Sequence, residues 1–439
     1  MPFFTSSDKA LWLLALPMIF SNITVPLLGL VDTAVIGHLE SPVYLGGVAV
    51  GATATSFLFM LLLFLRMSTT GLTAQAFGAK DPQALARALV QPLILALGAG
   101  AAIALFRTPI IDLALHIVGG SEAVLEQARR FLEIRWLSAP ASLANLVLLG
   151  WLLGVQYARA PVILLIVGNI LNIVLDLWLV MGLHMNVQGA ALATVIAEYA
   201  TLLIGLLMVR KVLHLRGVSL AMLKLAWRGN FRRLLALNRD IMLRSLLLQL
   251  CFGAITVLGA RLGGDIIAVN AVLMTLLTFT AYALDGFAYA VEAHSGQAYG
   301  ARDGGQLLDV WRAACRQSGI VAILFSLIYA LFGEQIIALL TSLPQIQLLA
   351  DRYLIWQVIL PLVGVWCYLL DGMFIGATRA AEMRNSMAVA AAGFALTLFA
   401  LPLLGNHGLW LALTVFLALR GLSLAFIWRR HWRNGTWFA

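Results

Sequence analysis

Charged side chains are scarce in this chain. Only 11% of its 439 residues are Asp, Glu, Lys or Arg, and 62% are hydrophobic. A soluble globular protein carries about 25% charged residues. The shortage excludes an ordinary soluble domain and indicates a protein built for a lipid bilayer.

Cysteine and nucleotide-binding signals are almost absent. The three cysteines are Cys251, Cys315 and Cys367, and they show neither a pairing pattern nor a metal-binding spacing. We interpret them as small hydrophobic residues. The pair Gly119-Gly120 is not followed by a P-loop, so nothing supports ATP as an energy source. We therefore expect no cofactor and no enzymatic activity.

Long apolar runs occupy most of the sequence. Each is too long for a buried strand, and the alternating ten-residue segments of a membrane barrel are missing. A helix satisfies its own backbone groups in lipid, so the runs predict an all-α integral membrane protein with twelve transmembrane helices. The expected spans are 10–37, 45–72, 88–106, 131–154, 161–183, 188–209, 234–260, 266–296, 317–341, 353–377, 386–405 and 409–428.

The net charge of +9 is distributed in a way that indicates membrane topology rather than nucleic-acid binding. Basic residues gather between the sixth and seventh spans, over residues 210–239, and again after the twelfth span, at 429–433. With an even number of spans both clusters share the side of the N-terminus. The positive-inside rule then places both termini in the cytoplasm of a multi-pass protein in a bacterial-type inner membrane.

The chain also repeats itself. The segment QAFGAKD, Gln75–Asp81, returns 222 residues later as QAYGARD, Gln297–Asp303. The same offset carries Gly150 onto Gly372 and Gly154 onto Gly376. Two parallel repeats of six spans are typical of transporters, with the substrate handled between the halves. We predict a first lobe over 1–209, a basic cytoplasmic linker over 210–233, and a second lobe with a short basic tail over 234–439.

Four segments resemble one family of transporters. They are VDTAVIGHL in the first span, QAFGAKD after the second, GNILNIVLDLWLV in the fifth and LDGMFIGATR in the tenth. The chain is similar in them to the multidrug and toxic compound extrusion (MATE) transporters, in the branch named for DNA-damage-inducible protein F. The resemblance implies a pseudo-symmetric two-lobe fold that exports cationic or amphipathic toxic compounds and drugs in exchange for H⁺ or Na⁺. Beyond these substrates we expect membrane lipids as partners, no nucleic acid, and a monomer.

Asp32 stands out because it interrupts the apolar first span. A charged Asp near the bilayer centre costs about 2.5–3.5 kcal/mol, and such residues usually face a cavity or a proton relay. The fifth span carries a stripe of Asn169, Asn172 and Asp176, and the sixth carries Thr194. Counted from the outer ends of their spans, Asp32, Asp176 and Thr194 all lie about 8–9 Å deep, at roughly 1.5 Å per residue.

Oxygen ligands at one depth suit Na⁺ or a shared proton. The family's first-lobe cation site maps position by position onto Asp32, Asn172, Asp176 and Thr194, so the resemblance assigns the same residues. Two like charges in a low dielectric cannot both be ionised cheaply, so we expect the acid pair to share one proton. The alternative is a fixed, hydrogen-bonded core pair.

Protonation of Asp32 would then rearrange the first span, with Pro17 and Pro26 as its hinges, and release a cationic drug outward. Glu198, one turn from Thr194, either extends this relay or makes a structural pair with a basic or hydroxyl group. We leave both interpretations open.

Acids of the second lobe lie at other depths. Asp285 and Glu292 share one face of the eighth span, and Asp371 lies in the tenth. Asp371 is a candidate for a second cation site, for an ion pair with Arg379 or for a contact at the helix end. Because no acid matches Asp32 at the repeat offset, we expect the cation chemistry to reside in the first lobe.

Three other functions were weighed. A lipid-linked oligosaccharide flippase would require a more cationic central cavity than the acidic first lobe predicts. An intramembrane aspartyl enzyme using Asp32 and Asp176 gains nothing from a full-length duplication. A structural scaffold does not explain polar groups at one depth. The sequence therefore favours a secondary multidrug exporter coupled to H⁺, with Na⁺ as the alternative ion.

Overall fold

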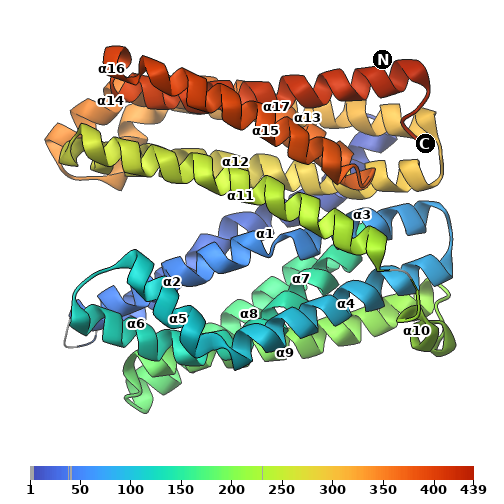
Figure 1. The fold of residues 1–439 in the computed structure, drawn as a ribbon, viewed down its shortest axis with the longest axis horizontal. Helices are drawn as coiled ribbons and strands as arrows, with labels where there is room; N and C mark the ends of the chain where they lie inside the picture. The colour runs from blue at the N-terminus through green and yellow to red at the C-terminus, as the bar shows by residue number, and fades with distance from the viewer. Residues whose placement is uncertain (1–3, 38, 40–41, 230) are drawn as a thin grey trace. The chain divides into compact units, whose positions relative to one another are not determined.

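The computed structural model describes residues 4–37, 39, 42–229 and 231–439, with the side chains of 24–34 and 37 outside the description. Throughout the described residues the chain forms helices and no β-strand (Figure 1). The structure confirms the all-α prediction.

Contacts divide the chain into two compact units, and each is best described by itself. One unit is Ile23–Leu235, and the other joins Met1–Asn22 to Ala236–Ala439. The first helix, α1 (Ser6–Gly37), therefore contributes its beginning to one unit and its end to the other. The domain boundaries expected from the sequence stay predictions.

The unit Ile23–Leu235 contains the end of α1 and the helices of the first repeat. They are α2 (Pro42–Leu61), α3 (Phe64–Gly78), α4 (Pro82–Leu105), α5 (Arg107–Val118), α6 (Glu122–Arg135), η1 (Trp136–Ser138), α7 (Ala139–Gly154), α8 (Arg159–Asp176), η2 (Leu177–Gly182), α9 (Asn186–Leu215) and α10 (Leu220–Ala226).

The other unit contains the start of α1 and the helices of the second repeat. They are α11 (Arg232–Leu262), α12 (Gly264–Gly300), α13 (Gly304–Leu340), α14 (Pro344–Gly376), α15 (Ala380–Thr397), η3 (Leu398–Ala400), α16 (Leu401–Leu404) and α17 (Asn406–Asn434).

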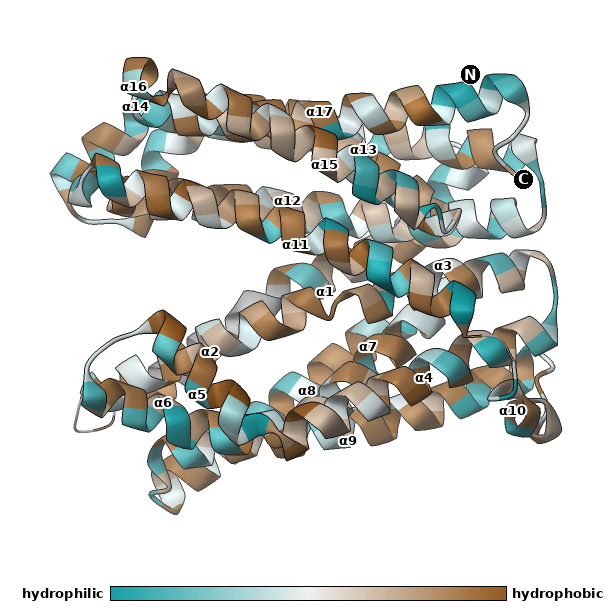
Figure 2. Ribbon diagram, in the orientation of Figure 1, coloured by the Kyte–Doolittle hydropathy of each residue, from teal (hydrophilic) through white to brown (hydrophobic). Residues whose placement is uncertain are grey.

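Eleven helical segments among the described residues are long and apolar enough to cross a membrane. They correspond one by one to the second through twelfth expected spans. In Figure 2 the ribbon of these helices is brown, the colour of hydrophobic residues, over much of their length. The first expected span, 10–37, falls in α1, and the side chains of much of its second half lie outside the described residues.

The internal repeat is visible in how glycines pack. A Cβ on Gly150 of α7 would lie 2.6 Å from the backbone oxygen of Arg66, and a Cβ on Gly372 of α14 would lie 2.7 Å from that of Ala288. Arg66 and Ala288 are themselves related by the repeat offset. In both halves, then, only a glycine lets these two helices approach so closely.

The two related loops fold alike. Lys80 and Arg302 both adopt a left-handed backbone, with φ of 54° and 53°. The next residue in each loop, Asp81 or Asp303, caps the following helix by accepting hydrogen bonds from its first backbone N–H groups. The QAFGAKD and QAYGARD segments are therefore equivalent turns, each of which ends one helix and begins the next.

The start of α1 is bound to α13 by hydrogen bonds. Asp8, which precedes the first expected span, is fully buried and accepts hydrogen bonds from Arg316 at 2.9 Å and Gln317 at 3.2 Å. Burial alone would raise the pKa of Asp8. Hydrogen bonds from Thr5, Gln317 and Arg316 outweigh that effect and hold the pKa below its ordinary value.

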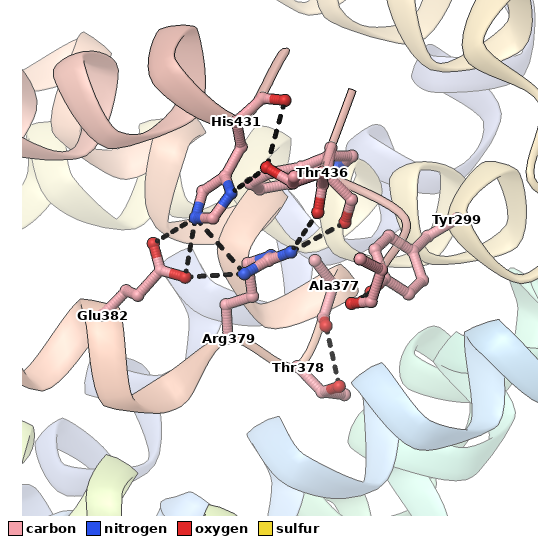
Figure 3. A network of polar contacts seen from close by, with 9 residues as sticks. Tyr299, Ala377, Thr378, Arg379, Glu382, His431 and Thr436 are labelled. Carbon is pink, nitrogen blue, oxygen red and sulfur yellow. Dashed lines mark hydrogen bonds and ion pairs between the residues drawn. The ribbon is translucent and has the colours of Figure 1, made fainter. Parts of the chain in front are cut away.

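The C-terminal tail is bound by hydrogen bonds to the unit of the second repeat (Figure 3). Arg379 donates to Glu382 Oε1 at 2.7 Å and to the carbonyl oxygens of Thr436 and Trp437, both at 2.9 Å. His431 lies between Glu382 and Thr436, 3.1 Å from Oε1 and 2.7 Å from Oγ1. Trp437 is only 1% exposed, so the tail is part of the core.

Candidate functional site

The candidate cation site of the first repeat begins on α8. Asn172 and Asp176 are one helical turn apart, and their exposures are 1% and 0%. Thr194 of α9 is buried beside them, and Asn172 Nδ2 donates to Thr194 Oγ1 at 3.4 Å. Thr194 Oγ1 in turn donates to the carbonyl oxygen of Ala190 at 3.2 Å. The fold therefore brings Asn172 and Thr194 together, although the depth argument had placed Thr194 level with Asp176 and Asn172 one turn deeper.

Oxygen atoms dominate this cluster. Asn172 Oδ1 is buried and accepts no hydrogen bond from the described residues. The carboxylate of Asp176 lies one turn further along the same helix, with no exposed surface. An uncharged amide oxygen and a carboxylate are both hard ligands for a small cation, and the carboxylate can also accept a proton. Among the described residues there is no group of three or more His, Cys, Asp or Glu that could hold a metal.

Two residues assigned to this site lie outside the described side chains. Asp32 and Pro26 fall in the second half of α1, where the helix itself is described and the side chains are not. Pro17, the other expected hinge, lies within the continuous α1. Participation of Asp32 in the site and hinge motion of α1 both stay predictions.

A π-helix follows Asp176 directly. Residues Leu177–Gly182 form η2, in which Leu183 N–H donates to the carbonyl oxygen of Trp178 at 2.9 Å. A Cβ on Gly189 of α9 would lie 3.1 Å from the Leu179 carbonyl, so α9 packs tightly on this wider turn. Short π segments recur at functional sites in helices. The apolar sequence LWLVMG gave no signal for it.

Glu198 has a partner that the sequence did not suggest. Asn145 Nδ2 of α7 donates to Glu198 Oε2 at 3.0 Å and to its backbone oxygen at 3.2 Å. The partner is thus an amide rather than a basic or hydroxyl group. Because Glu198 is one turn from Thr194 on α9, it continues the line of polar groups along the first repeat.

Asp371 of the second repeat is held by two arginines. Arg244 Nη2 donates to Asp371 Oδ2 at 2.6 Å, and Arg420 Nη2 donates to the same oxygen. All three residues are buried. The sequence had offered Arg379 as the partner, and that assignment is wrong because Arg379 is bound to Glu382 and the C-terminal tail.

The other two acids of the second repeat lie on α12. Asp285 is half-buried and close enough to Asp371, Arg244 and Arg420 to interact with them electrostatically, but it forms no ion pair with any residue that the structure describes. Glu292 is buried where α12 meets α14, and a Cβ on Gly376 would lie 2.9 Å from its backbone oxygen.

Buried arginines are the functional candidates that sequence reasoning missed. Arg66 of α3, Arg244 of α11 and Arg420 of α17 are each less than 10% exposed. Each interrupts an apolar span, and an ionisable residue inside a span is by itself a sign of function or of a buried partner. That signal was available in the sequence.

Comparison with known proteins bears on both halves of the chain. The MatE family model matches residues 17–178 and again residues 241–403. The chain is 92% identical to DNA damage-inducible protein F of Escherichia coli K12 over its full length and 96% of that protein. It is 24% identical to the probable multidrug resistance protein YoeA of Bacillus subtilis, over 85% of this chain and 81% of the relative.

Solved structures agree in fold. A crystal structure of MATE in the bent conformation superposes with a TM-score of 0.85 at 21% identity, covering 98% of this chain and 96% of the other. A structure of a MATE family transporter in an outward-facing conformation gives a TM-score of 0.81 at 21% identity, over 98% and 97%. The two-lobe fold of these transporters is therefore the fold of this chain.

Proposed function

The chain belongs to the MatE family of multidrug transporters, and we propose that it exports small cationic or amphipathic compounds in exchange for protons. The buried set of Asn172, Asp176 and Thr194 carries this proposal, because it gathers an amide oxygen, a carboxylate and a hydroxyl inside the first repeat. Na⁺ at the same ligands is the alternative coupling ion.

Coupling would depend on Asp32 together with Asp176. If both acids contribute to the site, repulsion between two carboxylates in a low dielectric keeps one proton bound to the pair. A cationic compound competes with that proton for the same negative charge. Proton entry from outside then removes the counter-charge of the compound and favours its release outward, and proton release to the cytoplasm restores the site.

The structure suggests what could transmit the change. The beginning of α1 belongs to the unit of the second repeat, and its end belongs to the unit of the first. A change in charge at Asp32 would therefore act on a helix that both units share. Pro17 and Pro26 lack the backbone donors that would stiffen α1 around them.

Localisation follows from the distribution of charge. Eleven described helices can span a bilayer, and the basic residues favour the side that carries both termini. We propose a bacterial inner membrane with both termini in the cytoplasm. Protons that enter the cytoplasm down their gradient would then drive export of the compound.

Flux measurements in proteoliposomes test the proposal. A pH gradient or a Na⁺ gradient is imposed separately, and efflux of a fluorescent organic cation is followed for the wild type, Asp32→Asn and the exposed-acid control Asp265→Asn. We expect the pH gradient to drive efflux by the wild type and by the control. The Asp32→Asn variant should show no efflux driven by the pH gradient. Efflux driven by the Na⁺ gradient and not by the pH gradient would contradict proton coupling. Efflux that responds to neither gradient would contradict antiport and favour the oligosaccharide flippase instead.

A substitution at Asn172 distinguishes H⁺ coupling from Na⁺ coupling. An amide oxygen can bind Na⁺, but the amide group neither gains nor loses a proton at physiological pH. If protons couple, Asn172→Ala should keep most of the pH-driven flux. If Na⁺ couples, the same variant should need a several-fold higher Na⁺ concentration for half-maximal flux, because one ligand oxygen is missing.

A further inference from the structure

The last helix changes character along one exposed face. Leu422 and Phe426 of α17 are 67% and 69% exposed, as expected for side chains in contact with lipid. Continuing the same helical stripe, the exposed residues are Arg429, Arg430 and Arg433. Figure 2 shows this change from brown to teal toward the C-terminal end of α17. The change marks the level at which acyl chains give way to headgroups.

The neighbouring helix α13 shows the same change at its start. Its exposed side chains include Ile323 and Leu327, and nearer its beginning lies the exposed Arg312. The two helices, far apart in sequence, meet at this level through Trp311 and Trp428, whose rings are 5.9 Å apart.

Aromatic rings continue from this contact toward the tail. Trp428 stacks on Trp432 at 5.6 Å, and Trp432 meets Phe438 at 6.5 Å. The indole N–H of Trp428 is buried and donates to none of the described residues. We call Trp311, Trp428 and Trp432, with Arg312, Arg429, Arg430 and Arg433, the Trp–Arg surface.

Several arginines of this unit are bound to acids. Arg379 binds Glu382 (Figure 3), Arg316 binds Asp8, and Arg384 binds Asp240. In contrast, the four arginines of the Trp–Arg surface form no ion pair or hydrogen bond with any residue that the structure describes. They are Arg312, Arg429, Arg430 and Arg433. Their charge is left for a partner outside the chain.

We propose that the Trp–Arg surface binds the phosphate headgroup of an anionic phospholipid. Guanidinium groups match phosphate oxygens with two parallel hydrogen bonds, and tryptophans favour the level of the headgroups. The exposed apolar stripe of Leu422 and Phe426 would lie along the acyl chains. A water-soluble anion would cover the arginines and leave that stripe bare, so the combination selects a lipid.

Quenching by brominated lipids tests this site. The detergent-purified full chain is titrated with phosphatidylglycerol brominated on its acyl chains, with phosphatidylcholine brominated in the same way, and with inorganic phosphate as a competitor, while tryptophan fluorescence is recorded. We expect the anionic lipid to bind at least ten-fold more tightly than the neutral one, with no competition by phosphate. Equal binding of both lipids would overturn the proposal. Displacement of the anionic lipid by a saturating concentration of inorganic phosphate would also overturn it.

Variants locate the binding. The triple variant R429Q/R430Q/R433Q should lose the preference for the anionic lipid. A control with the same change in charge, R210Q/K211Q/K224Q, alters exposed residues of the other unit and should keep the preference. If both variants lose the preference for the anionic lipid equally, the preference comes from general surface charge and there is no specific site.

Lysine substitution separates charge from geometry. R429K/R430K/R433K keeps the charge but not the paired donors of the guanidinium, so we expect affinity to fall about three- to ten-fold while the protein elutes as the wild type does. An unchanged affinity would contradict headgroup binding by paired donors. This substitution also keeps the test decisive if the glutamine variant does not fold.

Discussion

Loss of the Asp371 carboxylate should be among the most damaging single changes in the second repeat. Asp371 Oδ2 accepts hydrogen bonds from both Arg244 and Arg420, and the exposures of their side chains are 9% and 4%. Asp371→Asn keeps the shape of the side chain and removes its charge. Two guanidinium groups would then face each other in the interior without the acid that holds them.

The magnitude follows from the cost of an uncompensated buried charge. Removing one partner of a buried ion pair costs about 3–5 kcal/mol. Asp285 interacts electrostatically with both arginines but forms no ion pair with a described residue, so it would offset only part of the loss. We therefore expect Asp371→Asn to lose about 3 kcal/mol of stability, and Asp285→Asn to lose clearly less.

The half-life of the detergent-purified protein at elevated temperature measures this stability, because unfolding of such a protein is governed by a rate. The compensating variant D371L/R244M/R420M removes all three charges, and hydrophobic replacements of similar volume for a buried ion cluster are often as stable as the original. It should recover most of the lost half-life. A single variant as durable as the wild type, or a triple variant no better than the single, would refute the reasoning.

Three further predictions concern packing and pH. Because hydrogen bonds hold the pKa of Asp8 below its ordinary value of 3.8, its contribution is present above that pH and lost as the pH falls through the lower folded value. Asp8→Asn should therefore lower the melting temperature at pH 7, by the equivalent of about 1–3 kcal/mol, and the difference should shrink in acid. Trp437→Ala should cost about 3–5 kcal/mol, measured as a shorter half-life on heating, because a fully buried indole is removed. Gly372→Ala should cost about 1–3 kcal/mol in the same assay because its Cβ would lie 2.7 Å from a backbone oxygen, whereas Gly319→Ala meets nothing within 4 Å and should be neutral or stabilising.

Much of the fold could be predicted from the sequence because bilayer helices follow from length and hydropathy. The eleven described spans confirm this, and the repeat offset correctly paired Gly150 with Gly372. The matching turns at Lys80 and Arg302 were also predictable, since the same residues in the same order specify the same backbone. For the candidate site, the sequence named Asn172 and Thr194 as members of one cluster, but the depth argument matched Thr194 with Asp176, and only the structure shows the contact with Asn172.

Long-range pairing could not be predicted in the same way. Arg379 is eight residues from Asp371 and looked like its partner, but the sequence does not show that Arg244 and Arg420 converge on that acid from other helices. The π-helix after Asp176 has no sequence signature, because its apolar residues fit an α-helix equally well. The use of the tail as core became visible only through the burial of Trp437.

Left-handed turn residues recur at the repeat offset, at Lys80 and Arg302 and again at Gln156 and Thr378. A tandem duplication of one ancestral gene accounts for this agreement. An ancestral half of six helices, inserted in a single direction, would have needed a second identical chain to complete a carrier. Fusion freed the two copies to diverge, since each needed only to satisfy its own neighbours. At these turns the chain has kept the path of its backbone even where the side chain has changed, as between Gln156 and Thr378.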